Sequence, residues 1–268
     1  MDLGLAGQGV VVLGAASGIG KAIAQEFVAE GARVAVIDRA SSIRQSAEAL
    51  TVGAEPVVPF EADVTDYVAL QEIAAQIETR VGPVAHVVFA VGIGSGKYGF
   101  PFWNMNPSDW GKVLEVNLMG AVNTAYAFTP AMRTRQTGSL LFLSSVAGQI
   151  GSQTDPPYSA SKAALINFSQ CCAKDLADYN IRVNTLNPGM VNTPLNESIW
   201  RASNANLPAD QQLTFDEWSS QKIGRIVPLK RWQEPADIAA MAVFLASARA
   251  NNITGQTVNV DGGFVMHW

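Results

Sequence analysis

The chain has 268 residues, of which 48% are hydrophobic and 15% are charged. This charged fraction is well below the roughly one quarter of typical soluble domains, which excludes intrinsic disorder and a coiled coil. The formal net charge is −5 and no basic run occurs, so we expect no nucleic-acid partner and no anionic membrane surface. The length suits a single α/β domain with a large buried core.

Cysteine usage, apolar runs and histidine content indicate where the protein works. The only cysteines, Cys171 and Cys172, are chain neighbours that cannot pair on a helix. The start lacks the basic residues of a signal peptide, and the longest apolar stretch, 81–94, is interrupted by a proline and a histidine. We therefore expect a cytoplasmic protein without a membrane segment. Because His86 and His267 are the only histidines, we also expect no catalytic metal and no histidine-based triad.

Strand-like apolar runs alternate with helix-like stretches along the chain. The strands are continuously apolar, which is typical of strands buried on both faces, and right-handed crossovers then give a doubly wound layout. The sequence therefore predicts a single-domain α/β protein with a Rossmann fold, a parallel sheet covered by helices on both faces. We expect strands at 9–13, 33–37, 57–60, 84–88, 140–143, 181–186 and 257–260, and helices at 21–30, 41–50, 68–80, 107–130, 158–179 and 235–246.

The segment 187–226 interrupts this alternation. It carries three prolines, polar residues and two tryptophans. We interpret about 190–226 as a mobile lid over a substrate.

A glycine-rich turn joins the first strand to the first helix, with glycines spaced G-x-x-x-G-x-G. Backbone N–H groups and the helix dipole can face a pyrophosphate at such a turn, where larger side chains would block the approach. Tight strand-to-helix turns use glycine anyway, so the turn by itself leaves nucleotide binding open. The expected cofactor contacts in this turn are Gly14, Ser17, Gly18, Ile19 and Gly20.

An acidic residue ends the second strand. Asp38 follows Gly20 by 18 residues, where a carboxylate can hold both ribose hydroxyls and would repel a 2′-phosphate, so NAD is favoured. Asp38 could instead cap a turn, and Arg39 could pair with a 2′-phosphate, which keeps NADP as an alternative. Asp63 and Val64 follow the third strand and are expected beside the adenine, although Asp63 could equally cap a turn.

A tyrosine and a lysine begin the helix after the fifth strand. Tyr158 and Lys162 are four residues apart and share one helix face. A free phenol has a pKa of about 10, so it is a poor base at neutral pH unless a nearby ammonium favours the phenolate. Ser145, 13 residues earlier, is close enough through one loop to hydrogen-bond the same substrate oxygen.

With these motifs the sequence resembles the short-chain dehydrogenase/reductase family over nearly its whole length. The spacing of the motifs together is highly specific, although each residue alone has an ordinary structural explanation. The motifs are the Gly14/Gly18/Gly20 turn, Asp63-Val64, Asn117-Leu118-Met119-Gly120, Ser144-Ser145, Tyr158-x-x-x-Lys162, Asn187-Pro188-Gly189 and the segment from Gly255 to Gly263.

The resemblance implies roles for individual residues. Tyr158 would be the general acid/base, Ser145 would polarise the carbonyl or alcohol, and Lys162 would bind the nicotinamide ribose and lower the pKa of Tyr158. Asn117 would anchor a water relay to Lys162, and the hydride would pass between the nicotinamide and the substrate carbon. The resemblance also implies a homotetramer, and cofactor contacts from Ala90, Gly92, Pro188, Gly189, Val191 and Thr193.

Two positions depart from the family pattern. Phe89-Ala90-Val91-Gly92 replaces the usual Asn-Asn-Ala-Gly, and Leu13 replaces the usual threonine before the first glycine. We expect these changes to affect local support of the sheet rather than hydride transfer.

The substrate is less well defined, because the loops expected around it, 94–106, 149–155 and 190–223, carry no motif. We expect substrate contacts from Ser145, Gln149, Gln153 and Tyr158. The polar loop side chains favour a polyol, a sugar or a sugar acid. Loop aromatics, Phe100, Phe102, Trp103 and Trp200, favour an apolar ring instead.

The function that we expect is an NAD-dependent oxidoreductase that interconverts a secondary alcohol and a ketone. One alternative is an NADPH-dependent ketone or 3-oxoacyl reductase. Another is a non-catalytic protein that senses NAD, although such a protein would not need Ser145, Tyr158 and Lys162. A further hypothesis is that Trp268, at the hydrophobic carboxyl end, reaches a neighbouring subunit's site.

Overall fold

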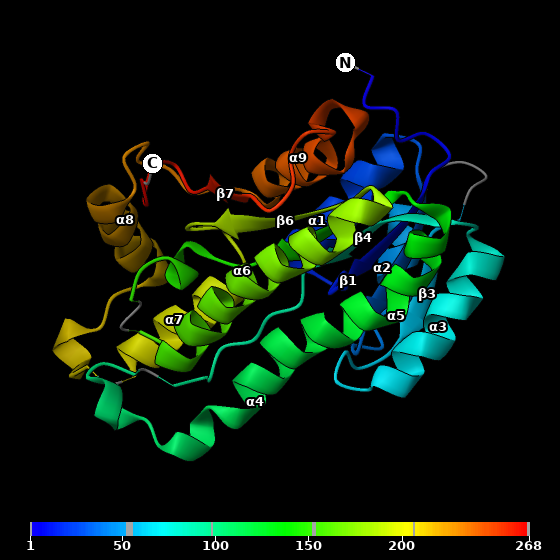
Figure 1. The fold of residues 1–268 in the computed structure, drawn as a ribbon. Helices are drawn as coiled ribbons and strands as arrows, with labels where there is room; N and C mark the ends of the chain where they lie inside the picture. Colours follow the sequence, from blue (N-terminus) through cyan, green and yellow to red (C-terminus); the bar gives the residue numbers. More distant parts are fainter. Residues whose placement is uncertain (1, 52–55, 98, 152–153, 206, 267–268) are drawn as a thin grey trace.

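Seven parallel strands form one sheet in the order β3-β2-β1-β4-β5-β6-β7 (Figure 1). The computed structural model describes residues 2–51, 56–97, 99–151, 154–205 and 207–266. All seven expected strands are confirmed, with ends within two residues of those predicted. They are β1 (Gly9–Leu13), β2 (Arg33–Asp38), β3 (Val58–Glu61), β4 (Val84–Phe89), β5 (Gly138–Leu143), β6 (Ile181–Pro188) and β7 (Thr257–Val260).

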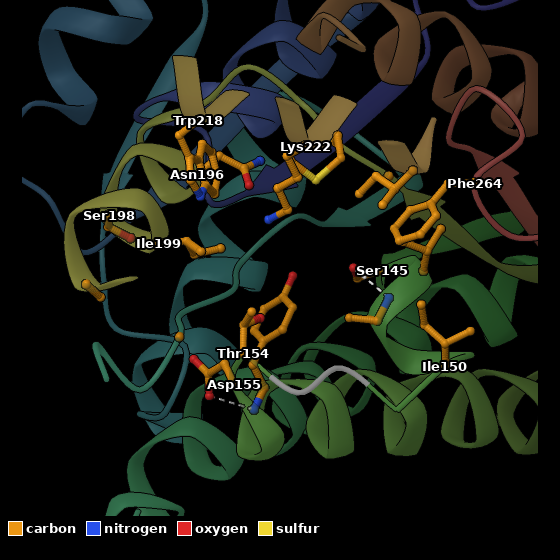
Figure 2. A pocket seen from close by; sticks show the side chains of 18 of the residues that line it. Ser145, Ile150, Thr154, Asp155, Asn196, Ser198, Ile199, Trp218, Lys222 and Phe264 are labelled. Atoms are coloured by element: carbon orange, nitrogen blue, oxygen red, sulfur yellow. Dashed lines mark hydrogen bonds between the residues drawn. The ribbon is translucent and has the colours of Figure 1, made fainter. Parts of the chain in front are cut away.

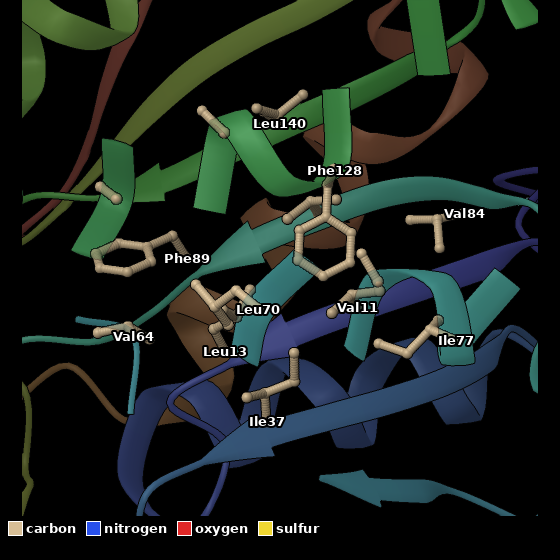
Figure 3. Close-up of a cluster of buried hydrophobic side chains, with 14 of the residues drawn as sticks. Val11, Leu13, Ile37, Val64, Leu70, Ile77, Val84, Phe89, Phe128 and Leu140 are labelled. Atoms are coloured by element: carbon tan, nitrogen blue, oxygen red, sulfur yellow. The ribbon is translucent and has the colours of Figure 1, made fainter. Parts of the chain in front are cut away.

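Helices cover both faces of the sheet, as the doubly wound prediction requires. One face is covered by α1 (Gly18–Ala29), α2 (Ile43–Leu50) and α9 (Pro235–Ala246), and the other by α3 (Tyr67–Arg80), α5 (Gly120–Arg135) and α6 (Pro156–Leu176). Strand β1 shows why, because successive side chains of a strand point to opposite faces. Val10 and Val12 pack with α1 and α9, whereas Val11 and Leu13 pack with α3 and α5 (Figure 3). Continuous apolar strands therefore build two cores at once.

The helix expected at 107–130 is wrong in its details. A 3₁₀ turn (Pro107–Asp109) and a short helix α4 (Gly111–Leu114) lead into a π-helical turn at Glu115–Met119, and α5 then continues to Arg135. Pro130 lies inside α5 rather than at its end. π-Helical turns are frequent at functional positions, and this one carries the buried Asn117.

Two further boundaries differ from the predictions. Helix α6 begins at Pro156 rather than Tyr158, because proline is favoured at the first helical position and Asp155 caps the helix. The segment interpreted as a lid contains α7 (Pro194–Asn204), a 3₁₀ turn (Ala209–Gln211) and α8 (Phe215–Ile226). The polar composition of this segment obscures the amphipathic pattern of its helices in the sequence. Of the two cysteines on α6, Cys171 is exposed and Cys172 is half-buried.

Strands β1 and β4 are neighbours in the sheet although a long stretch of chain separates them. The crossovers leave in opposite directions from this pair, so the carboxyl ends of β1 and β4 flank the crevice where ligands bind in open α/β sheets.

Candidate active site

The glycine turn after β1 lies against the chain that leaves β4. Gly14 has φ +86°, and a Cβ there would lie 2.9 Å from the Ala90 carbonyl carbon. A Cβ on Gly20 would lie in the same way against the Gly14 carbonyl oxygen, at 2.1 Å. The backbone N–H of Ala90 donates to the Leu13 carbonyl oxygen at 2.9 Å. These backbones are therefore in close contact, and only glycine fits at positions 14 and 20.

The first turn of α1 is open to an anion. Ser17 is the N-cap residue but its side chain makes no cap hydrogen bond, and the first turn carries no acidic residue. Gly18 has φ +58°, and the only atom within 4 Å of a Cβ built there is Thr193 Cγ2, at 3.8 Å. A helix N-terminus with free N–H groups and an open approach fits a pyrophosphate. Ile19 packs partly against the core.

Asp38 lies beside this turn. Its carboxylate accepts hydrogen bonds from the backbone N–H groups of Ala16 and Ala40, both at 3.0 Å, while the next residue, Arg39, is exposed. Asp38 therefore combines the two sequence interpretations, because it caps a local turn and also lies against the glycine turn.

Asp63 and Val64 have partners of their own. The Asp63 carboxylate accepts from the Thr65 N–H at 2.9 Å and hydroxyl at 2.8 Å, and the N–H bond is the main cause that lowers the pKa of Asp63. The Val64 side chain is buried against Gly120 in the core. The position of these two residues after β3 is what supports a role beside an adenine, since both side chains are already engaged within the protein.

A cavity of about 670 Å³ opens beside the carboxyl ends of β5 and β6 (Figure 2). The three loops expected around the substrate all contribute to it, together with α7 and α8. Its lining includes Gly94, Lys97, Ser145, Ile150, Asp155, Tyr158, Met190, Asn196, Trp218, Lys222, Arg225 and Phe264. The volume is within the range of small-molecule sites.

Ser145 and Tyr158 meet at the floor of this cavity. Ser145 follows the end of β5 and accepts a hydrogen bond from the Ala147 N–H at 3.1 Å, and its hydroxyl is also hydrogen-bonded to Tyr158. Burial is the main cause that raises the pKa of Tyr158 to about 12; the hydrogen bond with Ser145 acts in the opposite direction, and the nearby Asp155 carboxylate adds to the rise. The phenol is therefore held in its protonated form within reach of a ligand oxygen.

Lys162 lies behind Tyr158, one helical turn along α6. Its ammonium donates to the Leu143 carbonyl oxygen at 2.8 Å and to that of Val91 at 3.4 Å. It lies 5.6 Å from the centre of the Tyr158 ring. Burial lowers the pKa of Lys162 to about 7. A Cβ on Gly92 would lie 3.0 Å from Lys162 Nζ, so this glycine keeps the approach to the ammonium open.

Asn117 uses its side chain within the protein. Its Oδ1 accepts from the Ile93 N–H at 2.8 Å, and its Nδ2 donates to the Ile93 carbonyl oxygen and the Ser161 hydroxyl, both at 2.9 Å. The side chain therefore ties the π-helical turn to the loop after β4 and to α6. These contacts identify a positioning residue between β4 and Lys162.

The connection from β6 to α7 forms another edge of the crevice. Gly189, after Pro188, packs so tightly that a Cβ would lie 2.7 Å from the Asp261 side chain. Val191 is buried, its carbonyl oxygen accepts from Asn196, and Thr193, at the N-cap position of α7, lies opposite Gly18. The structure thus brings this expected cofactor edge beside the glycine turn.

The predicted substrate contacts are only partly in place. Ser145 and Tyr158 line the cavity, but the Gln149 side chain accepts from Asn259 Nδ2 at 2.8 Å and is not part of the lining. Gln153 and Trp268 lie outside the described residues. The loop aromatics Phe102 and Trp103 are exposed on the surface, 68% and 71%, because their short 3₁₀ turn lies outside the cavity.

Sequence reasoning missed several lining residues. Trp218 and Lys222 stand four residues apart on α8, the same spacing that drew attention to Tyr158 and Lys162, so a helix assignment for the lid would have paired them. Asp155 was recognisable as an N-cap before two prolines; its carboxylate accepts from the Ser95 N–H at 2.7 Å, and burial raises its pKa. Phe264 had no local signal, because only tertiary folding brings it here.

The residues present fit a nicotinamide dinucleotide, because the uncapped helix, the glycine cradle and the carboxylate at β2 all face one crevice. Among the residues that the structure describes, no group of histidine, cysteine or acidic side chains could hold a metal ion. In the same part of the chain, no helix is long and apolar enough to cross a membrane.

Comparisons with known proteins agree on one family. The family described as enoyl-(acyl carrier protein) reductase matches residues 14–265. The chain is 31% identical to 2,3-dihydro-2,3-dihydroxybenzoate dehydrogenase of Bacillus subtilis, covering 97% of each chain. It is 34% identical to 3-oxoacyl-(acyl-carrier-protein) reductase of Thermotoga maritima, covering 98% of this chain and 99% of the relative. The structure of L-sorbose reductase from Gluconobacter frateurii, solved with NADPH and L-sorbose, matches with a TM-score of 0.89 and 29% identity over the whole of both chains.

Proposed function

Because the chain belongs to the short-chain dehydrogenase/reductase family, whose members are NAD(P)-dependent oxidoreductases that act on CH–OH groups, we propose that it uses NAD to oxidise a secondary alcohol of a polyol, sugar or sugar acid. The observation that carries the proposal is the hydrogen-bonded Ser145–Tyr158 pair at the cavity floor with Lys162 behind it. L-Sorbose reductase, similar over its whole length, supports a polyhydroxylated substrate.

In this proposal the chain's own residues orient the substrate and move its proton. The Tyr158 hydroxyl exchanges a proton with the substrate oxygen, and the Ser145 hydroxyl hydrogen-bonds the same oxygen. A buried phenol favours its neutral form, which suits proton donation to a ketone. Oxidation needs the phenolate, which Lys162 would stabilise while its amine is protonated. A bound nicotinamide supplies the hydride acceptor or donor.

Further residues hold the parts in place. The pyrophosphate would lie on the N-terminus of α1, between Gly18 and Thr193. Asn117 would position Lys162 and a water relay through its bonds to Ile93 and Ser161. Ala90, Gly92, Pro188, Gly189 and Val191 border the crevice in which the nicotinamide would lie. The segment 190–226 would act as the substrate lid.

The choice of NAD rests on Asp38. A 2′-phosphate beside this carboxylate would place two negative groups together next to the glycine turn. A specific observation favours the alternative, an NADPH-dependent ketone or 3-oxoacyl reductase. The sorbose reductase structure holds NADPH, a relative is a 3-oxoacyl reductase, and Arg39 is exposed beside Asp38.

A panel assay tests the proposal. NADH or NADPH formation is measured at mildly alkaline pH with polyols, aldoses, sugar acids and cyclic secondary alcohols, with acetoacetyl-CoA reduction as the alternative arm. We expect turnover with NAD and a sugar-like alcohol. Faster reduction of the acyl thioester with NADPH would replace this proposal by the alternative one.

An Asp38→Ser variant tests the cofactor assignment separately. Removing the carboxylate should lower the ratio of kcat/KM for NAD to that for NADP by roughly 10- to 100-fold, because an ionic repulsion of about 1.4–2.7 kcal/mol is lost. Arg39→Ala should lower activity with NADP alone. An unchanged ratio in Asp38→Ser would show that Asp38 only caps the turn.

We also propose that the protein is a cytoplasmic homotetramer. Val68, Met119 and Tyr126 are large apolar side chains exposed by 47–63%, which suits a covered face. Two free cysteines, one of them exposed, suit a reducing compartment. Light scattering coupled to gel filtration measures the assembly, and a monomer at micromolar concentration would contradict it.

A further inference from the structure

The cavity is lined by a lysine, Lys222, that the proposed hydride transfer does not use. Lys222 lies on α8, four residues after Trp218, and its ammonium lies 4.5 Å from the centre of the Trp218 ring. Figure 2 shows its side chain reaching from α8 into the cavity, whose other wall carries Ser145 and Asp155. The aromatic face holds the ammonium in this direction.

The described residues provide no counter-ion for this lysine. Lys97, at the rim, is paired with Asp109 at 2.8 Å, and none of the ion pairs of the described chain includes Lys222. The Asp155 carboxylate is bound by the backbone N–H groups of Ser95 and Tyr158. Arg225, the third cation of the lining, is exposed. The α8 side of the cavity therefore carries positive charge without a matching anion.

Such an arrangement is unfavourable in the empty cavity. Burial lowers the pKa of Lys222 to about 8, because water is partly removed from the ammonium while no carboxylate replaces it. A ligand anion would restore the missing partner, and charge-assisted hydrogen bonds are the strongest that proteins make.

We propose that Lys222 binds a carboxylate carried by the substrate, so that the substrate is a hydroxy acid or the corresponding oxo acid rather than a neutral polyol. This inference rests on the proposed oxidoreductase function. One half-buried ammonium matches a single negative charge, and Ile150, Ile199 and Phe264 offer apolar contact for the carbon skeleton. It also selects the sugar acid among the three substrate classes proposed above.

Matched pairs of compounds test the charge requirement. In each pair a carboxylate is replaced by a CH₂OH group: D-gluconate and D-glucitol, 3-hydroxybutyrate and 1,3-butanediol, mandelate and phenylethanediol. We expect the wild-type protein to prefer the acid in at least one pair by 10-fold or more in kcat/KM. A preference for the neutral member in every pair would overturn the proposal.

Variants assign the preference to Lys222. Lys222→Met should reduce the acid-to-neutral ratio of kcat/KM by about 10- to 100-fold, the range of a charge-assisted hydrogen bond, and Lys222→Arg should restore most of it. Lys174→Met is the matched control, because Lys174 is exposed near the end of α6 and away from the cavity. An equal loss for both members of a pair would show that Lys222 only supports the lid.

A labelling experiment separates this inference from the proposed function. Acetic anhydride acetylates a neutral lysine amine, with loss of acetate and one proton, and peptide mass spectrometry locates the label. The acid of the preferred pair should protect Lys222, but not Lys174, from acetylation. If no acid is turned over, each acid is tested in turn. The neutral compounds should not protect Lys222. Protection without any turnover would retain the anion site and refute the oxidoreductase proposal. Turnover with no protection and an unchanged ratio in Lys222→Met would refute the anion site.

Discussion

The two walls of the cavity are supported differently. The wall that carries Ser145 and Tyr158 belongs to the sheet and α6, which are packed into two large clusters of buried residues. The opposite wall is formed by α7 and α8, and α8 packs on a small cluster with Met190, Ile223 and Val227 as its buried residues. Stability differs across a structure according to such packing, so we expect Ser145 and Tyr158 to be held more rigidly than the wall of α7 and α8.

This difference in packing corresponds to a difference in what the proposed function requires of the residues in each wall. In the proposed function the wall of the sheet and α6, called here the sheet wall, holds a proton donor at fixed geometry, which requires particular residues at fixed spacing. The wall of α7 and α8, called here the lid wall, would only have to match the shape and charge of one substrate. The following predictions test whether substitutions in the sheet wall have larger effects than substitutions in the lid wall.

The largest effect is expected at the proton donor. Tyr158→Phe removes the hydroxyl and keeps the ring, so kcat should fall by about 10³-fold, within the range of general acid–base catalysis. The dissociation constant of NADH, measured by fluorescence titration, should change by less than about threefold. A loss of kcat below 10-fold would mean that another group transfers the proton.

The next effect is expected at the glycine turn. Gly20→Ala places a Cβ 2.1 Å from the Gly14 carbonyl oxygen, so α1 has to move away from the turn. Overpacking of this kind costs about 1–3 kcal/mol, and the cofactor should bind more weakly by about 10-fold or more. Gly111→Ala is the control, because a Cβ there meets no atom within 4 Å and its helical backbone favours alanine. Equal cofactor affinity in both variants would contradict a tight cradle.

The sequence predicted the sheet wall well because the signals there are local. Continuous apolar runs gave all seven strands and the Rossmann fold, and the spacing of Tyr158 and Lys162 placed them on one helix face. The π-helical turn around Asn117 was not predictable, because it depends on the contacts with Ile93 and Ser161. The roles proposed for these residues remain predictions.

The lid wall was predicted poorly for a physical reason. The helices α7 and α8 are rich in polar residues, and apolar residues such as Trp218 line the cavity and pack only against a small cluster. Gln149 was expected at the substrate, but the partner that takes its side chain, Asn259, lies 110 residues away in the chain. No local pattern encodes such a contact.

The smallest effect compares Lys162, behind Tyr158, with Lys222, in the cavity, through the pH dependence of stability. An unfolded lysine keeps its proton up to a pKa of about 10.5, whereas burial lowers the pKa of Lys162 to about 7 and that of Lys222 to about 8. Between the pKa of each buried lysine and that of the unfolded lysine, the unfolded chain binds more protons than the native one, so the free energy of unfolding rises with pH.

The window from pH 7 to pH 8 isolates this contribution, because Cys172 and Tyr158, whose pKa values are raised by burial to about 12, oppose it only above about pH 8, where an unfolded cysteine begins to lose its proton. Urea unfolding of the cofactor-free protein should show a rise of about 1 kcal/mol from Lys162 and less from Lys222. Lys162→Met should remove most of the slope, Lys222→Met a smaller part, and Lys174→Met none. If the free energy of unfolding fell with pH in this window, or if Lys162→Met kept the full slope, the ammonium of Lys162 would already be stabilised by its bonds to the Leu143 and Val91 carbonyl oxygens. The sheet wall would then hold a permanent positive charge beside Tyr158, and the lysine on the lid wall would be the only one of the two that depends on its ligand for a partner.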